Sequence, residues 1–142
     1  MAGVSRVPSN YKLLGRHELT TSTSSSNATN VVDDGLTLSI AYLPSRILRV
    51  TLSMAFLAPG GSQAVILELL RGATSLGYFQ TDQLSTTVVS ANTYTRTILG
   101  PATGATETFK VKFGPAQAAT SVTSYGAANL PKQLIVEDLG PQ

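Results

Sequence analysis

The sequence predicts an all-β domain of eight to nine short antiparallel strands behind an extended N-terminal arm. Large apolar residues alternate with small or polar ones in several segments, as they do in half-buried strands. The 12 Gly and 7 Pro residues provide breakers between these segments. No segment shows the apolar period of an amphipathic helix. This pattern is typical of a sandwich, a jelly roll or a barrel.

The first thirty residues contain one expected strand. Residues 1–10 include Pro8, Ser9 and Asn10 and show no periodicity, so they are expected to form the arm, with residues 11–142 as a single domain. Residues 11–20 are expected to form the first strand. Residues 21–30 are almost entirely Ser, Thr and Asn, a composition that favours a solvated loop or a polar edge.

Two long alternations follow, and they predict the best-defined strands. Residues 36–42 place Leu36, Leu38, Ile40 and Tyr42 on one face, and Asp33-Asp34-Gly35 precede them. Residues 48–56 then place an apolar residue at every second position, and five alternations in succession are not expected by chance. Both strands are expected to bury their apolar face.

A turn and a hairpin are predicted in the middle of the chain. Residues 58–62 (APGGS) predict a turn. Residues 65–71 are rich in Val, Ile and Leu, and the short length of the run before Gly72 favours a strand buried on both faces. A hairpin at residues 70–74 then leads into a strand at 75–81, where Leu76 and Tyr78 alternate.

Four further strands complete the expected set. A strand is expected over residues 94–98, and residues 100–104 end it with two Gly and one Pro. Phe109, Val111 and Phe113 alternate with polar residues up to Gly114-Pro115, and residues 115–119 are the only candidate for a short helix. The remaining strands are expected at residues 121–125 and 132–137, with Leu134 and Val136 facing inward.

The composition indicates a surface covered by hydroxyl groups instead of charges. Only 13% of the 142 residues are charged, about half the usual share, whereas 33 are Ser or Thr. A surface with so few charges resists self-association weakly, which favours a protein whose surface is covered by partners. The net charge of +2 and the scattered Lys and Arg residues argue against nucleic acid as a partner.

Compartment and membrane association follow from the same sequence. There are no Cys residues, so disulfides and thiolate metal sites are excluded. No apolar run approaches the roughly 18 residues of a membrane span, and no membrane partner is expected. The N-terminus has no apolar stretch behind Arg6 and does not resemble a secretory signal, so synthesis and folding in a cytoplasm are expected.

Residue types that carry catalysis or bind cofactors are scarce. His17 is the only His, and it is interpreted as a plain strand residue because a catalytic triad or a zinc site would have to be built around it alone. Asp33-Asp34-Gly35 is interpreted as a turn before a strand, with a calcium site as the alternative. Residues 100–104 lack the ending of a phosphate-binding loop. The prediction is therefore a non-enzymatic protein with no cofactor and no metal.

The five Tyr residues leave a binding function open. Tyr11, Tyr42, Tyr78, Tyr94 and Tyr125 could form a carbohydrate platform if they were clustered and exposed. Several of them occupy positions with the parity of core residues, which favours a structural role.

Four segments carry a resemblance to a known family. They are residues 13–16 (LLGR), 45–51 (SRILRVT), 69–77 (LLRGATSLG) and 131–141 (PKQLIVEDLGP). In this order they resemble the C1q/TNF-like jelly-roll domains of tailed-bacteriophage virion proteins, namely minor tail proteins and head decoration proteins. The ending VEDLGP is the most characteristic piece. The resemblance spans residues 11–141 and implies a jelly roll.

The resemblance also implies an assembly and a location. Domains of this type usually form homotrimers in which one sheet of each protomer packs around a threefold axis. The implied function is a trimeric minor tail protein on the virion surface, with other virion proteins as partners. The arm would anchor it to the particle, through Val4, Arg6, Val7 and Tyr11.

Three alternatives to the tail function stay open. The trimer could decorate a capsid and clamp major capsid subunits. The domain could be a carbohydrate- or peptide-binding module, with a host surface glycan as one possible ligand. An enzyme built from distant residues would need converging titratable groups, which one His supplies poorly.

Overall fold

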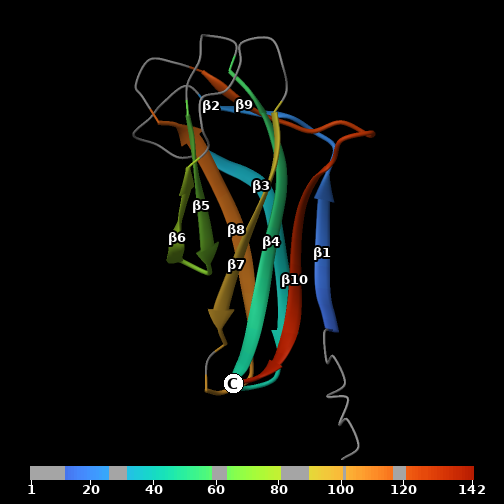
Figure 1. Ribbon diagram of the computed structural model, residues 1–142, viewed down its shortest axis with the longest axis vertical. Coiled ribbons are helices and arrows are strands. Elements are labelled where there is room, and N and C mark those ends of the chain that lie inside the picture. The colour runs from blue at the N-terminus through green and yellow to red at the C-terminus, as the bar shows by residue number, and fades with distance from the viewer. Residues whose placement is uncertain (1–11, 26–31, 59–63, 81–89, 101, 117–120) are drawn as a thin grey trace, which may run out of the picture.

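The computed structural model of the protein (Figure 1) describes residues 12–25, 32–58, 64–80, 90–100, 102–116 and 121–142. In these ranges the chain forms ten strands and no helix, so the predicted all-β class is confirmed. In chain order the strands are β1 (Lys12–Leu19), β2 (Thr23–Ser25), β3 (Val32–Tyr42), β4 (Arg46–Leu57), β5 (Val65–Arg71), β6 (Thr74–Gln80), β7 (Ser90–Leu99), β8 (Ala105–Pro115), β9 (Val122–Tyr125) and β10 (Lys132–Pro141).

Some predictions lie outside the described residues. These are the arm at residues 1–10, most of the turn at residues 58–62, and most of the candidate helix at residues 115–119. No helix in the described part of the chain is long and apolar enough to cross a membrane.

The strands form two antiparallel sheets packed face to face (Figure 1). In the first, here called the β4 sheet, the order is β1-β10-β4-β7. On the side of β4 that faces β10, the last residues of β4 extend past the start of β10 and pair with β9, which in turn pairs with β2. In the second, the β8 sheet, the order is β3-β8-β5-β6. Without the short strands β2 and β9, this is the arrangement of a double-sheet jelly roll.

The core lies between the sheets and contains the apolar side chains that the alternation of residues 48–56 predicts to face inward. In β4, Leu48, Val50, Leu52, Met54 and Phe56 are all at most 2% exposed, and they alternate with half-buried polar residues until Ala55. Phe56 packs on Phe113 of the opposite sheet with ring centroids 6.0 Å apart. Each buried aliphatic or aromatic side chain contributes about 1.5–3 kcal/mol through removal from water.

The hairpin β5–β6 has the predicted position, but the side chains of β6 that face the core are not the predicted set. Gly72 has a φ of +60° in the turn, a conformation that Gly adopts without strain. A register shift follows, because Gly77 (φ +118°) faces Leu69 while Ser75 faces Leu70. Leu76 and Phe79 therefore pack against the core, whereas Tyr78 is 61% exposed. The expected Leu76–Tyr78 alternation is wrong at Tyr78.

The interpretation of Asp33-Asp34-Gly35 as a turn before a strand is also wrong. All three residues lie inside β3, at a bulge where the pairing with β8 shifts between Asp33 and Thr37. Gly35 has a φ of +83°, and its N–H donates a hydrogen bond to Asp33 Oδ1 at 2.9 Å. The local chain bends as an Asp-Gly turn does, but pairing with β8 continues the strand on both sides.

Side-chain hydrogen bonds join the sheets along their long edges. At the β1/β3 edge, His17 Nδ1 accepts a hydrogen bond from the Thr37 backbone N–H at 3.2 Å. At the β6/β7 edge, the Arg96 guanidinium donates to the Leu76 carbonyl and lies over the Phe79 ring. His17 thus lies in a strand, as the sequence predicts, and its ring connects β1 to β3.

Candidate functional site

The predicted anchoring residues Val4, Arg6, Val7 and Tyr11 lie outside the described part of the chain. Two other features carry polar groups in an arrangement that core packing alone does not explain. One is the outward face of the β4 sheet, and the other is a buried ion pair between the sheets.

The outward face of the β4 sheet is lined with hydroxyl groups, and we call it the hydroxyl face. It consists of the side chains that alternate with the core residues on three neighbouring strands, β10, β4 and β7: Arg49, Thr51, Ser53, Thr93, Thr95, Thr97, Gln133, Ile135 and Glu137. Ile135, Thr51 and Thr95 are direct neighbours across the sheet. The short Thr and Ser side chains leave few projections over the middle of this face, so it can approach another surface closely.

The charged side chains on this side of the sheet are paired with each other. The guanidinium of Arg49 donates to Glu137 Oε2 at 2.8 Å, and Arg16 forms an ion pair with Glu18 at the β1 edge. The face therefore has no net charge. Two copies could approach each other without like-charge repulsion.

The outward face of the β8 sheet differs in its charges and its exposed aromatic ring. Lys110 and Lys112 alternate with inward-facing residues of β8, and Glu68 of β5 pairs with Lys112 in the register. Tyr78 stands opposite Glu68 on β6 and is exposed. This face is the less suitable of the two for contact between identical copies.

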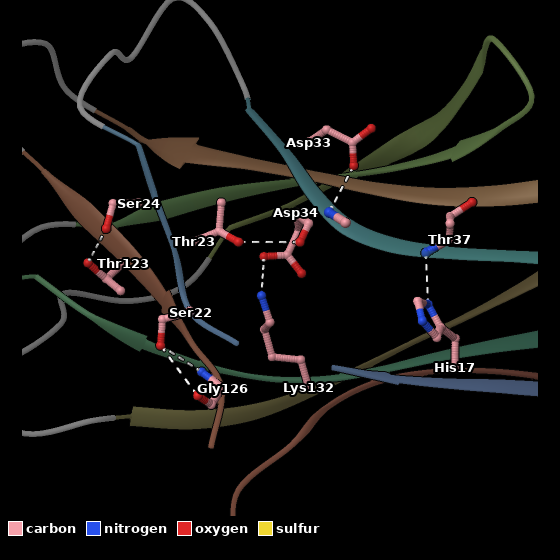
Figure 2. Close-up of polar contacts among 11 residues, drawn as sticks. His17, Ser22, Thr23, Ser24, Asp33, Asp34, Thr37, Thr123, Gly126 and Lys132 are labelled. Carbon is pink, nitrogen blue, oxygen red and sulfur yellow. Dashed lines mark hydrogen bonds and ion pairs between the residues drawn. The ribbon is translucent and has the colours of Figure 1, made fainter. Parts of the chain in front are cut away.

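The second feature is an ion pair that crosses the core at the end of the sandwich where β2 and β9 lie (Figure 2). Lys132, the first residue of β10, donates from Nζ to Asp34 Oδ1 of β3 at 2.8 Å. Both side chains have no exposed area. Thr23 of β2 donates to the Asp34 backbone carbonyl at 3.4 Å, so three strands meet at this residue.

The second oxygen of the Asp34 carboxyl lies near the Ser124 hydroxyl. No described residue donates a hydrogen bond of normal geometry to Asp34 Oδ2, and the buried Ser124 Oγ also lacks such a partner there. Burial raises the pKa of the Asp34 carboxyl above its ordinary range, against the opposing effects of Lys132 and of the nearby Ser124 hydroxyl. The carboxyl group is thus buried, close to an amine and incompletely hydrogen bonded.

The sequence does not predict this pair, because Asp34 is expected in a turn and Lys132 at the start of a strand. A usable signal was present, because Lys132 has the same parity as the inward-facing Leu134 and Val136. A Lys at such a position needs a buried partner.

No group of three or more metal-ligating side chains occurs in the described ranges, so the calcium alternative at Asp33-Asp34 finds no support there. The Tyr residues in these ranges have separate surroundings. Tyr42 is buried beside Glu107, Tyr94 packs on Phe79 with centroids 5.3 Å apart, and Tyr78 is exposed on the outward face of the β8 sheet. In the part of the chain that the structure describes, these Tyr residues do not form a shared carbohydrate platform.

Tyr42 supplies a prediction about alkaline stability. Burial, followed by the hydrogen bond that its hydroxyl donates to Glu107, raises the pKa of Tyr42 above its ordinary value. This contribution to stability is fully present below pH 10, the pKa in the unfolded chain, and is lost as the pH rises toward the folded value. From pH 8 to pH 11, the stability advantage of the wild type over Tyr42→Phe is expected to shrink by about 1.4 kcal/mol.

Urea unfolding of both proteins at the two pH values measures this difference. Groups that titrate in both proteins cancel in the comparison, and Tyr78→Phe provides an exposed control. An advantage that stays constant from pH 8 to pH 11 would contradict the assignment.

The architecture and the hydroxyl face define a class: a jelly-roll β-sandwich with one neutral, hydroxyl-rich outer face. No protein-family model and no curated protein matches the sequence. Among solved structures, the chain is similar to the infectious bursal disease virus VP2 subviral particle, with a TM-score of 0.50 and 11% identity. The match covers 93% of this chain and 38% of the VP2 chain, so the chain spans well under half of that protein's length.

Two further solved structures are similar to the chain. The Gt strain of infectious bursal disease virus gives a TM-score of 0.47 at 12% identity, covering 91% of this chain and 38% of that one. Dimeric latent PorU from Porphyromonas gingivalis gives 0.49 at 10% identity, covering 91% of this chain and 13% of that one. At such identities, the VP2 likeness establishes the fold: the chain is a β-sandwich of the jelly-roll type.

Proposed function

We propose that the chain is a non-enzymatic structural component of a bacteriophage virion, a homotrimeric minor tail protein attached to the particle surface. The observation that carries the proposal is the hydroxyl face, a hydroxyl-rich and neutral surface on a jelly-roll sheet. The viral particle named for VP2 supports a virion role for this fold, and the resemblance of residues 11–141 to phage C1q/TNF-like domains supports the phage and the trimer.

The hydroxyl face is the surface that we assign to the trimer contact. Its charges are neutralised within each copy, so three copies around an axis would not repel one another. Ile135 lies between Arg16 and Thr51 in the register and offers an apolar contact at the centre. A closed ring of this kind satisfies each copy's face without open-ended growth.

The test is the mass of the purified chain in solution, measured by light scattering for the wild type and for Thr95→Arg. We expect three chains for the wild type and a single chain for the variant, because three Arg side chains would meet at the interface without counterions. Thr37→Arg on β3 is the matched control, since Thr37 is also an exposed strand Thr but lies on the β8 sheet. The control should remain a trimer.

A wild-type protein that is monomeric at micromolar concentration would refute the trimer. A Thr95→Arg variant that remains trimeric while Thr37→Arg dissociates would move the contact to the β8 sheet. Either result would be clear only if the variants keep the wild-type circular dichroism spectrum, which both surface positions should allow.

A capsid decoration protein, clamping major capsid subunits, is the second candidate, favoured by the single compact domain. Antibody labelling of phage particles under the electron microscope separates the two. Label on tails supports the tail assignment, and label spread over heads replaces it with decoration.

A further inference from the structure

The ion pair between Lys132 and Asp34 places an amine and a carboxyl group in contact inside the core (Figure 2). We propose that these residues join through an isopeptide bond between Lys132 Nζ and Asp34 Cγ, with the loss of one water molecule. The bond would connect the first residue of β10 to β3 and so link the two sheets covalently. It is independent of the trimer proposed above.

The two groups are close enough to react. Nζ lies 2.8 Å from Oδ1, and a carbon–oxygen bond is about 1.2 Å long, so Nζ is at most roughly 4 Å from Cγ. Neither side chain has exposed area, so packing restricts both groups. Well-oriented groups within one molecule react as if present at about 10⁵–10⁸ M. Proximity of this kind can drive a condensation that free amines and acids do not undergo in water.

Burial also favours the protonated carboxyl group that the reaction needs. The nucleophile is the neutral amine, and the carboxyl group loses oxygen readily only when it is protonated. A buried carboxylate is costly in a medium of low polarity, which favours the protonated carboxyl group. Burial accordingly raises the pKa of the Asp34 carboxyl above its ordinary value.

The bond changes balance without any further reactant. The lone pair of Nζ attacks Cγ, forming the N–C bond, and one C–O bond of the carboxyl breaks. The departing oxygen carries the carboxyl proton and takes one of the two amine protons, so it leaves as water. The Ser124 hydroxyl, buried near the carboxyl and without a regular hydrogen bond among the described residues, is placed to pass that proton.

A competing reaction would remove the same water molecule. Asp34 precedes Gly35, and attack by the Gly35 backbone nitrogen on Cγ would close a succinimide ring. In the structure the Gly35 N–H donates to Asp33 Oδ1 at 2.9 Å, whereas Asp34 Oδ1 accepts from Lys132. The geometry therefore favours Lys132 as the nucleophile.

Mass spectrometry of the denatured full-length protein tests the proposal directly. The expected result is a deficit of one water molecule relative to the sequence, and a tryptic map in which the chain is uncut after Lys132 and a single branched peptide contains both residues. Lys132→Arg should show no deficit. Lys112→Arg, a control on the outward face of the β8 sheet, should keep it.

Two outcomes would overturn the proposal. One is a wild-type protein of full mass with normal cleavage after Lys132. The other is a deficit confined to a linear peptide around Asp34, which would indicate the succinimide. Both are read from the wild-type protein, so the test does not depend on any variant folding.

Discussion

Val50→Asp is expected to abolish soluble, folded protein. Val50 is 1% exposed in the middle of β4, and its neighbours in the sheet are Val136 of β10 and Arg96 of β7. The Arg96 guanidinium is directed to the Leu76 carbonyl at the sheet edge, where it also lies over Phe79. An uncompensated carboxylate at this site costs several kcal/mol, a large share of the about 5–15 kcal/mol that stabilises a domain.

The measurement is the soluble fraction after expression, followed by circular dichroism of any soluble material. Thr51→Asp is the matched control, because it places the same carboxyl one residue along the same strand but on the hydroxyl face. The control should remain soluble with a β-rich spectrum. If Val50→Asp were equally soluble and equally folded, the inward parity of β4 would be incorrect.

Lys132→Met is the second change with a large expected effect. Relative to the protein before the proposed isopeptide bond forms, it leaves the fully buried Asp34 carboxyl without its amine, and loss of one partner of a buried ion pair costs about 3–5 kcal/mol. The double variant Lys132→Met, Asp34→Leu removes both polar groups and should recover most of that loss. Urea unfolding of the single and double variants measures the two free energies.

A surface pair provides the comparison. Arg49→Met breaks the ion pair with Glu137, in which the Arg49 side chain is 39% exposed, and the expected cost is within about 1 kcal/mol. Additive losses in the Lys132/Asp34 double variant would show that the two side chains do not act as a pair.

The strand pattern could be predicted well from the sequence because the alternation of inward- and outward-facing side chains is a local property of a strand. The alternation at residues 48–56 corresponds to β4, and that at Phe109–Phe113 lies within β8. Where a Gly permits a register shift, local parity misleads: Tyr78 was expected inside but faces outward after the bulge at Gly77. Polar strands mislead in a similar way, since Ser25 in the Ser/Thr-rich segment is buried.

The buried ion pair could not be predicted from local sequence. Lys132 and Asp34 are separated by 98 positions, and only the crossing of β10 over β3 brings them together. The high Ser and Thr content predicts a hydroxyl-rich surface. The place of the hydroxyl face in the fold, however, depends on the register of three strands that are distant in sequence. The neutral charge pairing of that face likewise depends on Arg49 and Glu137 meeting across β4 and β10.

The position of β10 between β1 and β4 determines when the molecule can fold. Among the described strands β10 comes last in the sequence, yet it is inserted between β1 and β4 and pairs with both along most of its length. While the ribosome is still making residues 132–141, β1 has no partner within its sheet and one edge of β4 is open. Folding of the β4 sheet must therefore follow synthesis of β10 instead of accompanying it. Until then, the nascent chain is the form of the protein most exposed to aggregation and to chaperones.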